Sequence, residues 1–356
     1  MRWGLVLGGG GILGGAWMVG ALSALEDVHG LDVRDADIIV GTSAGSVTAA
    51  MLGAGVSVDE MRAHQFGDMA NSGLLATVVW DYDNITGGNL PPRPKLLGPG
   101  SASLVAANAR RLTRMPPTAI LAALLPEGRG TLDAVQKMVR GLVPEGWAPH
   151  PGVRAVAMDF DSGRRVAFGD PGAPPAHLAD AVVASCSIPG WYHPMTINGR
   201  RYIDGGACSA TNVDLTAGLG LDEVFVLAPM VSFTMDKPAN VRARMERQWR
   251  ERITRRCLRE VAKVHKGGTD VTVVGPGPED LAIIGGNLMA SDRRHVVLET
   301  ALRTTRDALG DPEALHHLPE PVKEADQDVG VDLDAVDPRH SDPAGGRLRA
   351  HLEETG

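Results

Sequence analysis

A serine in a glycine-flanked turn is the first arrangement in this sequence that could do chemistry. Gly41-Thr42-Ser43-Ala44-Gly45 is a G-x-S-x-G pattern between the apolar segment Asp37–Val40 and a helical pattern. In a nucleophile elbow the serine sits on a strained strand-to-helix turn, and the flanking glycines let neighbouring backbone approach closely. The pattern predicts Ser43 as a nucleophile supported by Gly41 and Gly45. A serine that only caps the following helix is the structural alternative.

A glycine run near the N-terminus is the second arrangement. Gly8-Gly9-Gly10-Gly11-Ile12-Leu13-Gly14 follows the short apolar segment Trp3–Leu7. Residues without side chains allow consecutive backbone N–H groups to point into one concavity, which suits an oxyanion. We therefore predict Gly9, Gly10 and Gly11 as the oxyanion hole.

The same glycine run also matches G-x-G-x-x-G, the fingerprint of dinucleotide sites, so a dinucleotide-dependent oxidoreductase is an alternative function. That interpretation expects an acidic residue at the end of the next strand, where it would bind the ribose. The next strand ends at Val40 and Gly41, whereas Asp35 and Asp37 stand at its beginning. A dinucleotide site would also leave Ser43 without a role, so we rank it second.

An aspartate far downstream is the third arrangement. Asp204-Gly205-Gly206 follows the predicted strand Arg201–Ile203. In isolation an Asp-Gly-Gly tripeptide is usually a turn. Beside a serine elbow and a glycine loop, however, Asp204 at a strand end could face the reactive group of another loop.

Taken in order, these motifs resemble the patatin-like phospholipases, a family of lipid acyl hydrolases. The family combines a glycine-rich oxyanion loop, a G-x-S-x-G elbow and a downstream D-G-[GA]. The segment Ala184–Pro194 is also similar to the family stretch A-S-x-A-x-P-x-x-F-x-P, with Ser187 and Tyr192 as mild departures. Leu13 stands where the family loop usually carries a basic residue. The resemblance covers residues 3–50 and 153–230.

The resemblance implies hydrolysis of lipid carboxylic esters, of the phospholipase A or lysophospholipase type, through a Ser43–Asp204 dyad. It implies no cofactor, and the sequence lacks HExxH, DxDxDG and paired Cys/His spacings that would indicate a metal. His193, the only histidine near a motif, is a weaker alternative base. A non-catalytic lipid-binding or membrane-associated protein that retains the pocket is the alternative function, and the intact Ser43 and Asp204 argue against it.

Positioning these residues requires a sheet between helices. Strand–turn–helix occurs twice in the first fifty residues, with strands at 3–7 and 37–40 and helices at 14–27 and 44–52, which predicts parallel strands. The expected fold is a three-layer α/β/α domain over residues 1–310 with a mostly parallel central sheet. Further strands are predicted at 153–159, 165–168, 195–197, 201–203, 223–227 and 270–274, and a helix at 177–185.

Residues 68–150 interrupt this alternation and predict a helical insertion that could form a cap, with helices at 102–113, 117–125 and 131–142. Its apolar residues are expected to shape the acyl pocket: Leu104, Val105, Ile120, Leu121, Leu124 and Leu125. The tail at 311–356 holds twelve acidic and four basic residues, a net charge of −8, and is expected to be disordered.

The formal net charge of the whole chain is also −8, so the body is close to neutral and gives no support to nucleic-acid binding. One segment, 241–266, is strongly basic, with a net charge of +7. We expect a helix that packs through five residues, Met245, Trp249, Ile253, Leu258 and Val261. The alternative is a surface that contacts anionic lipid headgroups.

Three cysteines without paired spacing favour a reducing compartment, and no apolar stretch approaches about 18 residues. Gly8–Gly11 interrupts the N-terminal apolar run, so the run does not read as a signal peptide. We expect a cytoplasmic protein, at most peripheral to a membrane. The sequence does not determine the oligomeric state.

Overall fold

The computed structural model describes residues 1–78, 100–101, 104 and 117–310. The predicted tail at 311–356, and all but Leu104 of the predicted helix at 102–113, lie outside these residues. The described chain forms an eight-stranded sheet in the order β5-β6-β3-β2-β1-β7-β8, with β4 beside β3. The strands are β1 (Trp3–Leu7), β2 (Ile38–Thr42), β3 (Val153–Asp159), β4 (Arg165–Phe168), β5 (Met195–Ile197), β6 (Arg200–Asp204), β7 (Glu223–Leu227) and β8 (Asp270–Val274).

The sheet is parallel from β8 to β3 and antiparallel beyond it. β7, β1, β2 and β3 pair in parallel, whereas β4 and β6 both run antiparallel to β3. All five residues of β1 are buried, and they alternate between two cores: Leu5 and Leu7 lie in one hydrophobic cluster and Val6 in another. This alternation shows that both faces of the sheet are covered.

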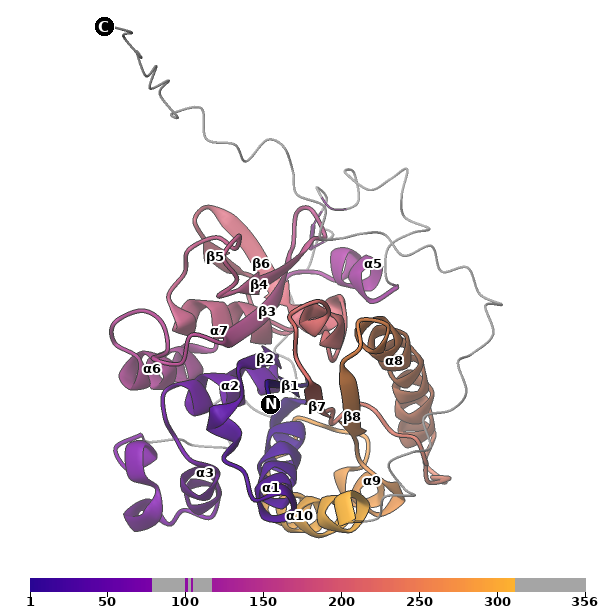
Figure 1. The fold of residues 1–356 in the computed structure, drawn as a ribbon. Helices are drawn as coiled ribbons and strands as arrows, with labels where there is room; N and C mark the ends of the chain where they lie inside the picture. Colours follow the sequence, from indigo (N-terminus) through magenta and orange to yellow (C-terminus); the bar gives the residue numbers. More distant parts are fainter. Residues whose placement is uncertain (79–99, 102–103, 105–116, 311–356) are drawn as a thin grey trace, which may run out of the picture.

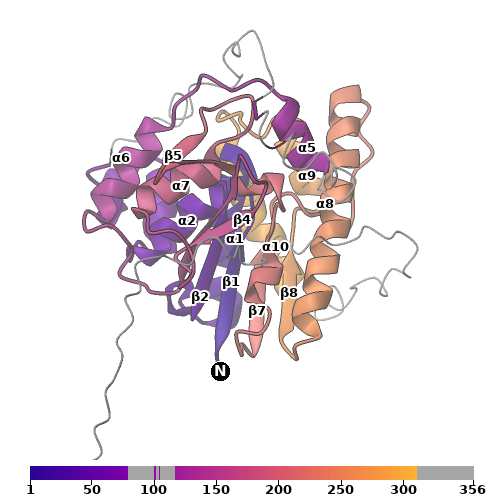
Figure 2. The same ribbon diagram turned by 90° about the horizontal axis from the view of Figure 1, so that it is seen from above.

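Helices cover the two faces, as Figures 1 and 2 show. One face carries α1 (Gly11–His29), α2 (Ala44–Gly53), α7 (Leu178–Cys186) and α10 (Arg294–Gly310), with α3 (Val58–Gln65), α6 (Asp133–Leu142) and α9 (Pro278–Ile284) beside them. The other face carries α8 (Val241–His265) and α5 (Pro117–Leu124). The predicted three-layer α/β/α architecture with a mostly parallel sheet is therefore confirmed. None of the described helices is both long and apolar enough to cross a bilayer.

Two element boundaries differ from the sequence prediction near the motifs. β2 extends to Thr42, so the strand runs directly into Ser43. α1 begins at Gly11 rather than Gly14, because Gly11 adopts a positive φ of 63° and lets the glycine run turn into the helix. β1 and β2 are parallel in a register that pairs Leu7 with Gly41, so the glycine run and the elbow leave the sheet side by side.

The helix predicted from the basic segment is present, but part of its predicted packing face is wrong. Met245 is 65% exposed, whereas Arg247 and Arg250 are buried. The two arginines can turn inward because Glu246 and Asp236 neutralise them in ion pairs. Part of the positive charge of α8 is therefore used inside the protein.

Candidate active site

Ser43 occupies the sharp turn between β2 and α2. Its backbone angles are φ 53° and ψ −123°, a strained combination for a residue other than glycine. Its side chain makes no capping hydrogen bond to α2, so the alternative role as a simple N-cap does not hold. A Cβ at Gly41 would lie 2.4 Å from the Gly45 carbonyl oxygen, and one at Gly45 would lie 2.0 Å from the Leu7 carbonyl oxygen. Both flanking positions therefore require glycine for close packing.

The sheet topology brings Asp204 to this turn. β3 lies between β2 and β6, and it pairs Val156 with Thr42 on one side and Ala157 with Asp204 on the other. The Ser43 side chain lies near the Asp204 carboxylate, close enough to lower the pKa of that carboxyl. The Gly206 N–H donates to the same carboxylate at 2.7 Å.

Gly205 packs directly against β3, where a Cβ would lie 2.4 Å from the Val156 carbonyl oxygen. The Asp204 N–H donates to the Ser187 carbonyl at 3.0 Å. The backbone on both sides of the Asp204 side chain is thus fixed. This rigidity holds the carboxylate in one position relative to Ser43.

Burial makes Asp204 an unusually basic carboxylate. Asp204 is 6% exposed, and desolvation raises its pKa to about 6, although its contacts with Ser43 and with the Gly206 N–H act in the opposite direction. An ordinary aspartate has a pKa of about 3.9 and is a weak proton acceptor. At neutral pH Asp204 is ionised and a much better base than an exposed aspartate.

The glycine loop adjoins the elbow, but its donors are not all available. A Cβ at Gly9 would lie 3.4 Å from the Ser43 Cβ, so the two loops touch. The Gly9 N–H, however, donates to the Ala210 carbonyl at 2.8 Å, which corrects the prediction that it serves an oxyanion. Within the described part of the chain, the N–H groups of Gly10 and Gly11 have no acceptor. They lie at the N-terminus of α1, where the helix dipole favours negative charge.

Two further residues support the elbow and were not singled out from the sequence. The Ser185 hydroxyl accepts from the Ser43 N–H at 2.9 Å and donates to the Val156 carbonyl at 2.6 Å. The Asn212 amide donates to the Thr42 hydroxyl at 2.9 Å. Ser185 belongs to the segment 184–194 that carried the family resemblance, which was a usable signal. Asn212 stands in no such motif.

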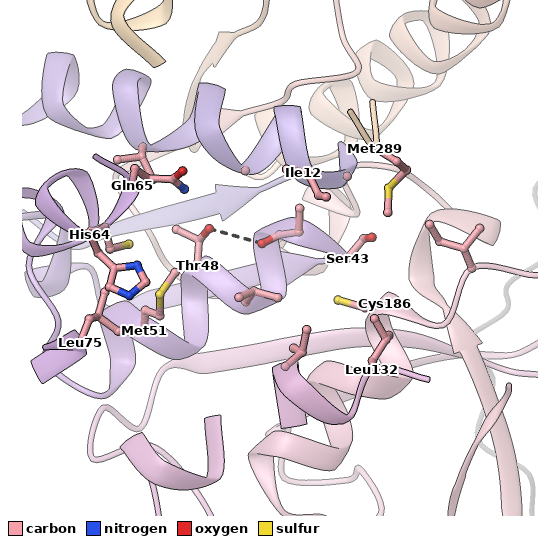
Figure 3. Close-up of a pocket in the computed structure, with 18 of the residues that line it drawn as sticks. Ile12, Ser43, Thr48, Met51, His64, Gln65, Leu75, Leu132, Cys186 and Met289 are labelled. Carbon is pink, nitrogen blue, oxygen red and sulfur yellow. Dashed lines mark hydrogen bonds between the residues drawn. The ribbon is translucent and has the colours of Figure 1, made fainter. Parts of the chain in front are cut away.

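An apolar cavity extends from Ser43 (Figure 3). One wall is a single face of α2, formed by Ala44, Val47, Thr48 and Met51 at helical spacing, and α1 faces it. The cavity reaches α3 at its far end. Its other lining residues are Gly11, Ile12, Gly15, Val19, Met61, His64, Gln65, Leu75, Leu132, Val135, Cys186, Ile188, Tyr192 and Met289.

The insertion shapes this cavity through residues other than those predicted. Its contributions are Leu75, Leu132 and Val135. The predicted Leu104 instead packs in a separate cluster with Ile120, because α5 lies on the opposite face of the sheet. The remaining predicted residues, Leu121, Leu124 and Leu125, are exposed, and Val105 lies outside the described residues.

The other reactive side chains near the site are poorly placed for catalysis. His193 is exposed and does not line the cavity. His64 does line it, but at the end away from Ser43, and its ring contacts the Val78 carbonyl at 3.1 Å. Cys186 lies beside Ser43, where burial raises the pKa of its thiol, so it stays protonated. Among the described residues no group of three His, Cys, Asp or Glu is placed to hold a metal ion.

A sequence model of the patatin-like phospholipases matches residues 5–217, more than half of the chain. The chain belongs to the patatin-like phospholipase family. The match includes both Ser43 and Asp204, and the family implies hydrolysis of lipid esters rather than dinucleotide chemistry.

Comparison with solved structures gives more distant similarities. VipD from Legionella pneumophila is 13% identical, with a TM-score of 0.41, over 87% of this chain and 67% of VipD. The type III effector protein ExoU is 15% identical, with a TM-score of 0.38, over 87% of this chain and 53% of ExoU. This chain therefore spans about half the length of ExoU. A search of curated proteins gave no match.

The raised pKa of Asp204 predicts a pH-dependent stability penalty. The folded protein holds this proton up to about pH 6, whereas the unfolded chain releases it near pH 3.8, so stability is lost as the pH rises through this window. The full penalty is about 3 kcal/mol. We expect Asp204→Asn to raise Tm at pH 8 and to change it much less at pH 4.

Thermal unfolding at several pH values measures this effect. Asp292→Asn is the matched control, since Asp292 is exposed at the surface. An equal change in Tm at both pH values for Asp204→Asn would contradict the buried, ionised state of this carboxylate.

Proposed function

We propose that this protein is a serine acyl hydrolase that cleaves lipid carboxylic esters, of the phospholipase A or lysophospholipase type. The observation that carries the proposal is the strained turn that places Ser43 beside the buried Asp204 at one end of an apolar cavity. Family membership supports the reaction class. The cavity supports an acyl chain as the group that is bound, because its walls offer few polar partners.

The first half of the reaction would acylate the enzyme. Ser43 Oγ attacks the ester carbonyl carbon while its proton passes to Asp204. The carbonyl oxygen becomes negatively charged and accepts hydrogen bonds from the N–H groups of Gly10 and Gly11. As the tetrahedral intermediate collapses, the bond between the acyl carbon and the glycerol oxygen breaks, and the lysolipid alcohol leaves with the proton held by Asp204.

The second half would release the fatty acid. A water molecule gives a proton to Asp204 and attacks the acyl carbonyl, and the same two N–H groups stabilise the second oxyanion. Ser43 recovers its proton as the acyl–oxygen bond breaks. Asp204 can serve as the base in both halves because desolvation keeps its pKa near 6.

Loss of either dyad residue should abolish turnover. We expect Ser43→Ala and Asp204→Asn to lower kcat by about 10³-fold or more on nitrophenyl esters and phospholipids. In the wild type, kcat/KM should rise with pH up to about 6 and then level off, since the base must be ionised. A fluorophosphonate probe should label wild-type protein and not Ser43→Ala.

The alternative of a lipid-binding protein without catalysis predicts a different result. Folded wild-type protein that neither hydrolyses the ester panel nor reacts with the fluorophosphonate would contradict the hydrolase. Retained turnover in Asp204→Asn would remove the dyad mechanism while leaving Ser43 as a nucleophile.

The cavity predicts which acyl chains fit. Met51 lines the α2 wall beyond Thr48, farther from Ser43 (Figure 3). Met51→Trp should block the far part and lower kcat/KM for long-chain esters by at least about tenfold, with little effect on butyrate esters. Leu124→Trp, at an exposed position on α5, is the control. Equal losses on short and long chains would place the acyl chain elsewhere.

We also propose peripheral contact with anionic membranes through one face of α8. Met245, Arg252 and Arg259 of α8, and Lys266 directly after its end, follow one another at seven-residue spacing and are exposed. Surface cations contribute about 1 kcal/mol each toward anionic bilayers. The triple change of Arg252, Arg259 and Lys266 to Gln should weaken binding to phosphatidylserine vesicles by about 100-fold, as sedimentation would measure.

Arg303→Gln on α10 is the control for general charge loss, because α10 covers the opposite face of the sheet. Vesicle binding that survives the triple change, or that is equal on neutral vesicles, would exclude this face as the contact.

A further inference from the structure

A fully buried arginine on α8 lies outside the dyad and the cavity lining. The Arg250 side chain has no exposed surface. A guanidinium is expensive to bury unless its donors are satisfied, so its partners indicate what it does. Its Nε and Nη2 donate to the Glu246 carboxylate at 3.0 and 2.7 Å. Its Nη1 donates to the backbone carbonyl of Pro229.

Pro229 forms the support behind the glycine loop. A Cβ at Gly10 would lie 2.7 Å from the Pro229 Cβ, and one at Gly14 would lie 3.1 Å from the same atom. The preceding residues continue this contact, since the Gly8 N–H donates to the Leu227 carbonyl at 2.9 Å. Arg250 thus fixes the carbonyl of the residue on which Gly10 rests.

Arg247 bonds a second segment, α9, which leads to the other side of the loop. It pairs with Asp236 at 2.5 Å and donates to the Leu281 carbonyl at 2.8 Å. The chain then runs from α9 to Leu288, whose carbonyl accepts the Leu13 N–H at 2.9 Å. The same carbonyl would lie 2.9 Å from a Cβ at Gly11. The glycine loop is therefore held between two backbone segments, and each of them is bonded to a buried arginine.

We propose that Arg250, assisted by Arg247, is a positioning residue for the oxyanion hole. It holds Pro229 against the glycine loop so that the Gly10 and Gly11 N–H groups face the oxygen that becomes charged when Ser43 attacks. The inference rests on the proposed hydrolase function and adds residues remote from the dyad to it. An oxyanion donor works only within about 2.7–3.1 Å of its target, so a small shift of this loop has a large effect on rate.

The test compares Arg250→Met, Arg250→Lys and wild type on a nitrophenyl ester, per active site titrated with a fluorophosphonate. For Arg250→Met we expect kcat to fall about 10–100-fold with KM changed by less than about threefold, and the fluorophosphonate reaction to slow in parallel. Arg250→Lys should fall between the two, because an ammonium keeps the charge but not the planar fork. The control is Arg255→Met, on the same helix but exposed and paired with Glu251.

A purely structural role would lower Tm and the number of titrated sites while leaving kcat per site at the wild-type value. That result would overturn the inference. If Arg250→Met does not fold, Pro229→Gly removes the support of Gly10 without leaving a buried charge unpaired. It should lower kcat per site as well, and wild-type kcat in a folded Pro229→Gly protein would overturn the inference. A wild type without any hydrolysis would instead refute the hydrolase function itself.

Discussion

The contact between the Ser43 hydroxyl and a desolvated carboxylate is the interaction on which the rest of this site depends. A carboxylate in water is too weakly basic to take a proton from a serine, but burial raises the pKa of Asp204 to about 6. The surrounding elements keep water away from Asp204 and fix its backbone. The same burial makes the ionised carboxylate a source of instability, which the rest of the fold must offset.

The change from parallel to antiparallel pairing at β3 brings Asp204 next to Ser43. Parallel strands β1 and β2 place the glycine loop and the elbow together at their carboxyl ends. β6 runs antiparallel to β3. Its final residue, Asp204, pairs with the β3 residue next to the one that pairs with Thr42 at the end of β2. Asp204 therefore reaches Ser43 from a different part of the chain. The proposed mechanism needs no histidine between the two.

In the proposed hydrolase, buried charge supports the glycine loop that would face the substrate. The buried arginines of α8 bond the carbonyl of Pro229, which packs against the glycine run, and the carbonyl of Leu281 in α9, and Glu246 and Asp236 neutralise them. Glycine has no side chain through which packing could fix the position of its backbone N–H group. A glycine loop that presents such donors must be held by its neighbours, and carbonyl-bonded arginines are rigid enough to do so.

The features that the sequence alone predicted are those that depend on local chemistry. Glycine spacing around Ser43, apolar strands before each motif and the Asp-Gly-Gly turn predicted the layers, the elbow and the acid, because each depends on neighbours within a few residues. Tertiary structure decided the rest. The Gly9 N–H is bonded to a carbonyl about two hundred residues away, and Arg250 is buried where its guanidinium meets the Pro229 carbonyl of the segment that follows β7. These hydrogen bonds and burials depend on contacts between residues that are distant in the sequence, and the periodicity of the sequence does not predict such contacts.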